Sequence, residues 1–380
     1  MRKYMPMIKD FTQRADMYLL SLCCICSVFG LVVISSATAS YGNVYRYIVV
    51  QLIALFIGIF LYIAFTVIDV DIFADNWLYL FIFNIAFILI LIPLGEEGDT
   101  GNKAWLRFAG IGIQPTEVVK ISFIVIMAKH ITYLKEYKNL NHWKSVFQLA
   151  AHCLLLVGLI FVVTRDMGSA LIFIAIFAVQ LFMAGLRLYW FAIGAAGVAV
   201  VFPFFWTHVL NQRYRDRIMA PYDPTIDPDN SGINWQANQS KIALASGQLT
   251  GTGFGEGTQT QSEALSQKHT DFIFAAVGEE LGMIACVAII ILLLLVIFRC
   301  VQVGMRSNNS MSFLICMGMA TFLTFQMFIN IGMCIGLTPV IGLTLPFFSY
   351  GGSSLFSTFA AMGIVSGIKY RPTPMRFYSL

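Results

Sequence analysis

The stretch His269-Thr270-Asp271-Phe272-Ile273-Phe274 opens the apolar run that decides the fold of this chain. Residues 272–298 carry charge only at Glu279 and Glu280, and a helix needs about 20 apolar residues to cross a bilayer. Asp271 is therefore expected at the water boundary, with the two glutamates deeper. Ionisable groups at membrane depth are costly and are kept mainly where they line a cavity or face a partner. The segment thus predicts an enzyme or a transporter.

The composition of the whole chain is that of a membrane protein. Of 380 residues, 58% are hydrophobic and 12% are charged, whereas a soluble domain carries about 25% charged residues. The net charge of +4 is too small to indicate a nucleic-acid partner. These values predict a polytopic integral membrane protein.

Apolar runs of spanning length recur along the chain and predict an all-α bundle of ten transmembrane helices. The expected spans are 17–39, 44–67, 77–94, 116–134, 147–164, 168–185, 188–207, 271–298, 311–335 and 345–368.

The basic residues orient these spans. By the positive-inside rule, the side that holds 14 of the 24 lysines and arginines is cytoplasmic. Both termini are then cytoplasmic in a multi-pass membrane protein. The long 208–270 loop, between the seventh and eighth spans, is then extracellular. We expect residues 1–380 to form one membrane domain.

The 208–270 loop is expected to be an ordered cap against the membrane. It contains three arginines at 213, 215 and 217, an aromatic residue at Trp235, and glycines at 247, 251, 253, 255 and 257. Disordered segments have few aromatic residues. The glycines follow no strand, so they do not form a dinucleotide-binding loop, and they indicate tight backbone bends.

Small residues follow Asp271 on one face of its predicted helix. Ala275, Gly278 and Gly282 lie within about 40° of the Asp271 direction. Such a face is typical of close helix packing, but it would also form a groove that admits a substrate beside Asp271. The sequence leaves both interpretations open.

Two further segments combine charge with a helix start. Gln114-Pro115-Thr116 reads as a loop-to-helix junction, and it is followed by Glu117 and Lys120 on one helix face. This pair either neutralises itself inside the bundle or offers Lys120 to a phosphate. Arg165-Asp166-Met167-Gly168-Ser169 is equally consistent with a simple turn. The polar stretch 346–354 interrupts the last span, which is tolerated only where it is buried or lines a cavity.

Several of these motifs, in this order, resemble the SEDS family of RodA, FtsW and SpoVE. They are Gln114-Pro115-Thr116-Glu117 with Lys120, Asp166-x-Gly168, Asp223-Pro224, Asp227-Pro228, Gln239-Ser240, the glycines of 251–257, the 269–274 stretch, Gly278-Glu279-Glu280-Leu281-Gly282 and Ser349-Tyr350-Gly351-Gly352-Ser353-Ser354. The resemblance implies a peptidoglycan glycosyltransferase that polymerises lipid II outside the cytoplasmic membrane, with a class B penicillin-binding protein as its partner. Pro339-Val340-Ile341-Gly342 looks more like the RodA branch.

The resemblance also implies roles for residues. Asp271 matches the essential aspartate of the family, and Glu117, Lys120 and Asp166 match polar residues of its central cavity. The other expected substrate-binding residues are Lys103, Trp105, Arg107, Gln114, Arg217, Gln239, Ser240, His269, Thr270, Glu279, Glu280 and Ser349. The chain departs from the family pattern at Ala104, Arg165 and Ser266-Gln267, where the family usually has Arg, Pro and Pro-Glu.

The expected reaction is an inverting displacement of undecaprenyl pyrophosphate, with Asp271 as general base, in cell elongation or division. The sequence requires no cofactor and predicts no metal ligand, and assistance by Mg²⁺ or Mn²⁺ stays open. Two other functions would suit a polar cavity in a helical bundle. One is a lipid II translocator without polymerase activity, and the other is a scaffold for the penicillin-binding protein.

Overall fold

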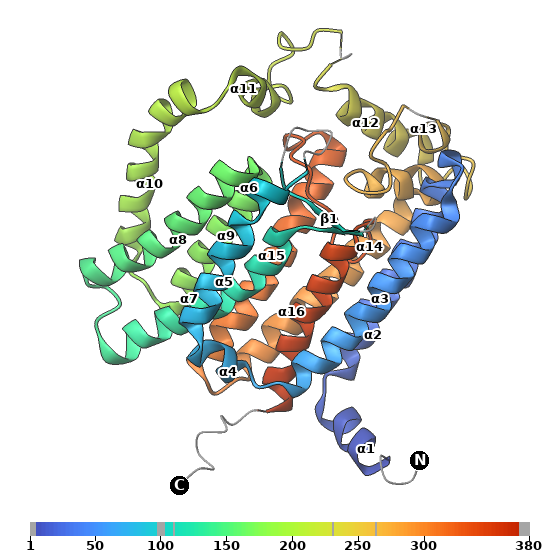
Figure 1. The fold of residues 1–380 in the computed structure, drawn as a ribbon. Helices are drawn as coiled ribbons and strands as arrows, with labels where there is room; N and C mark the ends of the chain where they lie inside the picture. The colour runs from blue at the N-terminus through green and yellow to red at the C-terminus, as the bar shows by residue number, and fades with distance from the viewer. Residues whose placement is uncertain (1–4, 97–102, 109–110, 230–231, 263, 372–380) are drawn as a thin grey trace.

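The computed structural model describes residues 5–96, 103–108, 111–229, 232–262 and 264–371 as a bundle of long helices (Figure 1). The helix α1 and the end of α16 lie at one end of the bundle, and α11, α12 and α13 lie at the other. We call these the α1 end and the cap end.

The long helices are α2 (Met17–Ala37), α3 (Val44–Val67), α5 (Trp77–Leu89), α7 (Pro115–Tyr137), α8 (Trp143–Thr164), α9 (Met167–Ala184), α10 (Leu188–Phe204), α14 (Ile273–Met305), α15 (Ser310–Ile335) and α16 (Gly352–Tyr370). The short helices are α1 (Met5–Arg14), α4 (Val70–Asp75), α6 (Leu91–Leu94), α11 (Gln212–Met219), α12 (Trp235–Gly247) and α13 (Thr258–Gln261). A 3₁₀ turn covers Ala39–Tyr41, and a π-helical turn, Phe205–Val209, continues α10.

The predicted all-α membrane bundle is confirmed. Eight helical segments of the described chain are long and apolar enough to span a membrane. The other two expected spans are α7 and α16, with 23 and 19 residues. Both helices can carry more polar residues than the other spans because neighbouring helices enclose them. The helix α7 packs against α5, α9, α15 and α16, and α16 also packs against α3 and α14. Their surfaces therefore face protein, where polar groups find partners.

Several predicted boundaries move. The last span begins at Gly352, because residues 345–351 form a non-helical turn, and the 77–94 span divides into α5 and α6. The 95–115 loop contains an unexpected antiparallel hairpin of β1 (Leu106–Phe108) and β2 (Ile111–Ile113). The expected eighth span starts at Ile273 and continues to Met305.

The helix α14 is interrupted at Gly282, whose φ of 78° and ψ of −179° are not helical. The backbone N–H of Met283 donates to Gln248 O at 2.9 Å, and that of Thr252 donates to Glu279 O at 2.9 Å. The backbone of the cap thus supplies the hydrogen bonds that the broken helix lacks. Unpaired backbone groups at this depth would be costly, so the cap and α14 depend on each other.

The helix α10 differs from the other long helices in its packing. None of its residues is buried, and it arches away from the bundle in Figure 1. Its side chains are apolar, which indicates that lipid covers most of its surface.

Candidate functional site

Asp271 lies in the turn that precedes α14, and other segments hold its backbone. The Oγ of Ser349 donates to Thr270 O at 2.6 Å, and the N–H of Tyr350 donates to His269 O at 2.8 Å. The Nδ2 of Asn330, on α15, donates to Asp271 O at 2.8 Å. The polar turn before α16 therefore fixes the position of the His-Thr-Asp motif.

The Asp271 carboxyl is partly buried, and charged groups lie near it. Burial raises its pKa to about 6, and the negative charge of Asp166 acts in the same direction. A hydrogen bond with Thr270 and the positive charge of Arg217 oppose that rise. Burial also lowers the pKa of Arg217, which belongs to α11 in the cap. A carboxyl group with such a pKa is mostly ionised at pH 7 and more basic than an ordinary aspartate, as a general base requires.

Gly342 lies next to the Asp271 carboxylate. At Gly342 the backbone φ is 74°, and a Cβ atom there would lie 3.5 Å from Asp271 Oδ2. A residue with a side chain would therefore be strained in its backbone, while its Cβ atom would only touch the carboxylate at an ordinary van der Waals distance.

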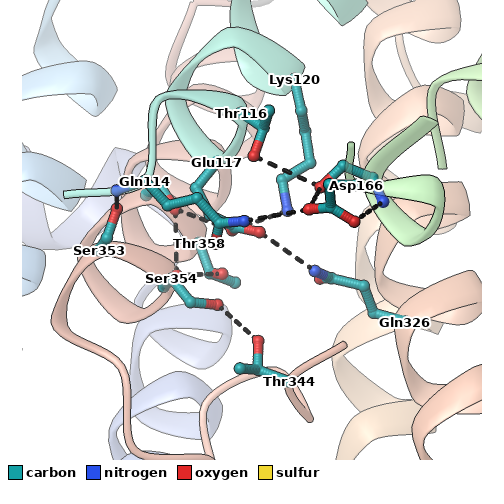
Figure 2. A network of polar contacts seen from close by, with 12 residues as sticks. Gln114, Thr116, Glu117, Lys120, Asp166, Gln326, Thr344, Ser353, Ser354 and Thr358 are labelled. Carbon is teal, nitrogen blue, oxygen red and sulfur yellow. Dashed lines mark hydrogen bonds and ion pairs between the residues drawn. The ribbon is translucent and has the colours of Figure 1, made fainter. Parts of the chain in front are cut away.

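Asp166 caps the N-terminus of α9 and belongs to a polar network (Figure 2). It accepts hydrogen bonds from Ser169 Oγ at 2.7 Å and from Gln114 Nε2 at 3.3 Å. Burial raises the pKa of the Asp166 carboxyl, and the nearby charge of Glu117 raises it further, whereas the bonds from Ser169 lower it. The segment is therefore a helix cap that also places a carboxyl group among the predicted site residues.

Glu117 and Lys120 form a buried ion pair of 2.8 Å in the same network. Gln326 Nε2 donates to Glu117 Oε1 at 3.5 Å, and Ser357 Oγ donates to Glu117 Oε2 at 3.4 Å. The ammonium group of Lys120 also lies 4.8 Å from the centre of the Phe322 ring. The pair thus has partners on two other helices, α15 and α16, as a self-neutralising pair would, and phosphate binding by Lys120 stays a prediction.

The hairpin carries predicted residues that lie at the surface. Lys103 is exposed, and Arg107 forms an exposed ion pair of 3.5 Å with Glu96. Trp105 packs on Gly112, where a Cβ atom would lie 3.1 Å from the indole ring. Gly101 and Asn102, which directly precede Lys103, lie outside the described residues. Gln114 ties the end of the hairpin to α16 through a bond of its N–H to Ser353 Oγ at 3.0 Å.

Gln239 and Ser240 lie on α12, behind the backbone of Asp271. Ser240 Oγ donates to Cys334 O at 2.8 Å, and the Cys334 thiol lies 3.8 Å from Asp271 O. Both side chains are buried. Ser240 therefore supports the Asp271 turn through Cys334, while direct contact of Gln239 or Ser240 with a substrate stays a prediction.

Glu279 and Glu280 are engaged with the cap. Glu279 accepts bonds from the N–H of Gln259 at 2.8 Å and from the N–H of Thr260 at 2.7 Å, and also from the hydroxyl groups of Thr258 and Thr260. Glu280 accepts from Gln261 Nε2 at 2.7 Å and from Ser36 Oγ. Their carboxylates face protein donors that anchor α13, and this placement favours a structural role over substrate binding.

The small-residue face of α14 is also filled by the cap. A Cβ atom at Gly278 would lie 2.3 Å from the Leu244 side chain, and one at Gly247 would lie 1.8 Å from Gly278 O. A Cβ atom at Gly282 would likewise lie 2.4 Å from Gly251 N and 2.4 Å from Leu249 O. These contacts support the packing alternative for this face and leave no space for the alternative of a substrate groove along it.

The sequence did not indicate the tyrosines that surround His269 or the burial of Lys268. The His269 ring lies among Tyr41, Tyr47 and Tyr350, with centroid distances of 5.3–5.5 Å. Burial lowers the pKa of His269 to about 4, with a further contribution from the charge of Lys268. Lys268 is fully buried and donates to Ser40 Oγ at 2.6 Å. No periodicity or charge pattern distinguishes these residues in the sequence.

The described residues contain no group of three or more His, Cys, Asp or Glu side chains that could hold a metal ion. Asp166 and Asp271 influence each other electrostatically but do not form such a set. Assistance of the reaction by a divalent cation stays a prediction.

The fold and this site define a polytopic membrane protein with an acidic centre beneath the cap. The family model described as "Cell cycle protein", for FtsW, RodA and SpoVE, matches residues 16–373. This chain belongs to that family.

Two curated relatives carry enzyme names. The chain is 36% identical over 287 residues to "Probable peptidoglycan glycosyltransferase FtsW" of Geobacter metallireducens, covering 75% of this chain and 74% of the relative. It is 34% identical over 285 residues to "Peptidoglycan glycosyltransferase MrdB" of Escherichia coli K12, covering 75% of that protein. These two identities do not favour the RodA branch that residues 339–342 suggested.

Solved structures show the same fold. One, titled "Structural coordination of polymerization and crosslinking by a peptidoglycan synthase complex", contains a chain that superposes with a TM-score of 0.78 at 24% identity, covering 94% of this chain and 98% of that chain. The Rod shape determining protein RodA of Thermus thermophilus superposes with a TM-score of 0.67 at 24% identity, covering 93% of this chain and 96% of that chain.

Proposed function

We propose that this protein is a peptidoglycan glycosyltransferase that polymerises lipid II into glycan strands at the outer face of the cytoplasmic membrane. The curated relatives named above support the activity. The observation that carries the proposal is the Asp271 carboxyl, which is held by its backbone, has a pKa raised to about 6 and lies near Arg217.

In the proposed reaction, Asp271 accepts the proton of the 4-hydroxyl of the acceptor sugar. The oxygen attacks the anomeric carbon of the donor, and the bond to undecaprenyl pyrophosphate breaks. A single displacement inverts the anomeric centre, so an α-linked donor gives a β-linked glycan. One positioned base contributes about 10²–10⁴-fold to the rate, so alignment and stabilisation of the leaving group must supply the rest.

Cationic groups suit the departing pyrophosphate. Arg217 is the best placed of them, because its positive charge is close enough to Asp271 to lower the pKa of that carboxyl. Lys103 and Arg107 lie on the exposed hairpin and suit a first contact with the substrate. Lys120 is already paired with Glu117, so the proposal does not depend on it.

The orientation follows from the basic residues. We propose that the α1 end faces the cytoplasm and the cap end faces outward, with the chain folded as a single membrane domain. Lipid II then meets Asp271 from the outer leaflet. The similarity to a chain of a peptidoglycan synthase complex supports a class B penicillin-binding protein as the partner.

Purified protein in liposomes with labelled lipid II tests the proposal. Glycan polymer would be made by the wild type and by Asp229→Asn, an exposed aspartate of the same cap, but not by Asp271→Asn. Transfer of lipid II between leaflets without polymer would indicate the translocator. If neither activity appeared even with the penicillin-binding protein present, the scaffold would be the better description.

A further inference from the structure

At the α1 end, two cations from different helices converge on one carboxylate. Arg299 Nε, on α14, lies 2.7 Å from Asp16 Oδ2, and Lys369 Nζ, on α16, lies 3.5 Å from Asp16 Oδ1. Asp16 is fully buried and caps α2. The three helices are thus joined to one another at the α1 end of the bundle.

A cavity of about 170 Å³ opens beside this junction. It is lined by Arg299, Val303, Arg306, Ser307, Ile368 and Lys369. A single water needs only about 10–15 Å³, so the cavity has room for a larger polar group. All charged side chains in its lining are basic.

The charges around the cavity do not cancel. Asp16 is one carboxylate between two of the cations, and Arg306 is exposed and forms no ion pair with any residue that the structure describes. An adjoining cavity holds Asp69 and Asp71 together with Arg371, and Arg371 lies 3.9 Å from Asp69 Oδ2. An excess of positive charge therefore remains at Arg306 and Lys369.

We propose that this cavity binds the phosphodiester headgroup of an anionic lipid. Basic pockets between transmembrane helices on the cytoplasmic side suit such headgroups, and the cavity is formed by the last turns of α14 and α16, where both helices leave the membrane. Cations near helix C-termini also interact favourably with the helix dipole, but this interaction does not require a cavity. This site is separate from Asp271, and only its placement in the cytoplasmic leaflet rests on the proposed orientation.

The test uses the full-length protein in detergent, titrated with phosphatidylglycerol and with phosphatidylcholine of the same acyl chains. Bound lipid is counted by native mass spectrometry. The wild type should prefer phosphatidylglycerol by at least about tenfold. Arg306→Gln with Lys369→Gln should weaken phosphatidylglycerol binding by about 25-fold, since each basic residue at an anionic surface contributes about fivefold.

A matched double variant, Lys135→Gln with Lys144→Gln, removes two exposed cations from the same end and should keep the preference. If the first pair fails to fold, Arg306→Gln alone should weaken binding by about fivefold. Equal retention of the two lipids by the wild type would overturn the proposal, as would an equal loss in both double variants. Inorganic phosphate that bound as tightly as phosphatidylglycerol would mean that a soluble anion, not a lipid, occupies the site.

Discussion

Among single residues, the protonation state of Asp271 should control the rate of polymerisation. A base must be ionised to accept a proton, so the rate of polymerisation should fall as the pH decreases through about 6, the pKa that burial gives this carboxyl. Lipid II polymerisation measured from pH 5 to 8 checks this. A rate that stayed constant across that range would contradict the assignment.

The same raised pKa predicts the stability of Asp271→Asn. In the unfolded chain the carboxyl titrates near its ordinary value, and in the folded protein near 6, so stability decreases as the pH rises between these values and stays lower above them. Replacing the carboxyl with an amide should therefore leave the free energy of unfolding at pH 7.5 unchanged or raise it by on the order of 1 kcal/mol, after allowance for partial exposure, and the melting temperature should not fall. Thermal melts of both proteins at pH 5 and 7.5 provide the measurement. A large destabilisation at pH 7.5 would mean that Asp271 is a structural residue.

Glu117 and Lys120 should behave as a coupled pair. Removing one charge leaves the other buried without its partner, at a cost of about 3–5 kcal/mol. Glu117→Ala and Lys120→Ala should each lower the melting temperature, and the exchange Glu117→Lys with Lys120→Glu should recover part of the loss. A Lys120→Ala protein that melted normally but bound lipid II poorly would instead assign the lysine to the substrate.

At the scale of elements, the cap is held by Glu279. This carboxylate accepts four bonds from the 258–260 segment, so Glu279→Ala should detach α13 and cost about 3 kcal/mol. The melting temperature and limited proteolysis of the cap measure the effect. Glu256→Ala, an exposed glutamate of the same loop, is the control and should behave like the wild type.

Gly282 should tolerate no side chain. Its φ is positive, and a Cβ atom would lie 2.4 Å from Gly251 N, so Gly282→Ala should abolish recovery of folded protein. Gly194→Ala has no heavy atom within 4 Å of its added Cβ and should be recovered normally. The yield of monodisperse protein after size-exclusion chromatography separates the two cases.

The limits of sequence reasoning are clearest in these elements. The long helices could be predicted from apolar runs, because a segment that spans a membrane must be apolar in composition. Nothing in the 272–298 run indicated the break at Gly282, because the backbone partners of that break come from residues 248–253. The functions expected of Glu279 and Glu280 rested on their depth, but the donors that surround them arrive with the cap. Asp271 was identified because it lies beside a span boundary, which the sequence does reveal.

At the scale of the whole molecule, the orientation is open to labelling. Ser262 lies in the cap and Asn139 lies in the turn between α7 and α8, and both are exposed. With the cap outside, Ser262→Cys should react with an impermeant thiol reagent in intact cells, and Asn139→Cys should react only after the cells are lysed. The wild-type protein gives the background from its eight native cysteines. Labelling at position 139 from outside would reverse the orientation and remove Asp271 from the outer leaflet.

The broken helix α14 has a consequence for how the chain is made. Residues 248–253 are synthesised before α14, and they must wait outside the membrane until Gly282 emerges. Of the 33 residues of α14, those after Gly282 are numerous enough to cross the bilayer alone, because about 20 suffice. The segment after Gly282 can thus insert into the membrane first. Residues 273–281, and Asp271 just before them in the chain, reach their final positions only when the cap folds onto them. The order of biogenesis then delays assembly of the acidic centre until the chain is already anchored in its membrane.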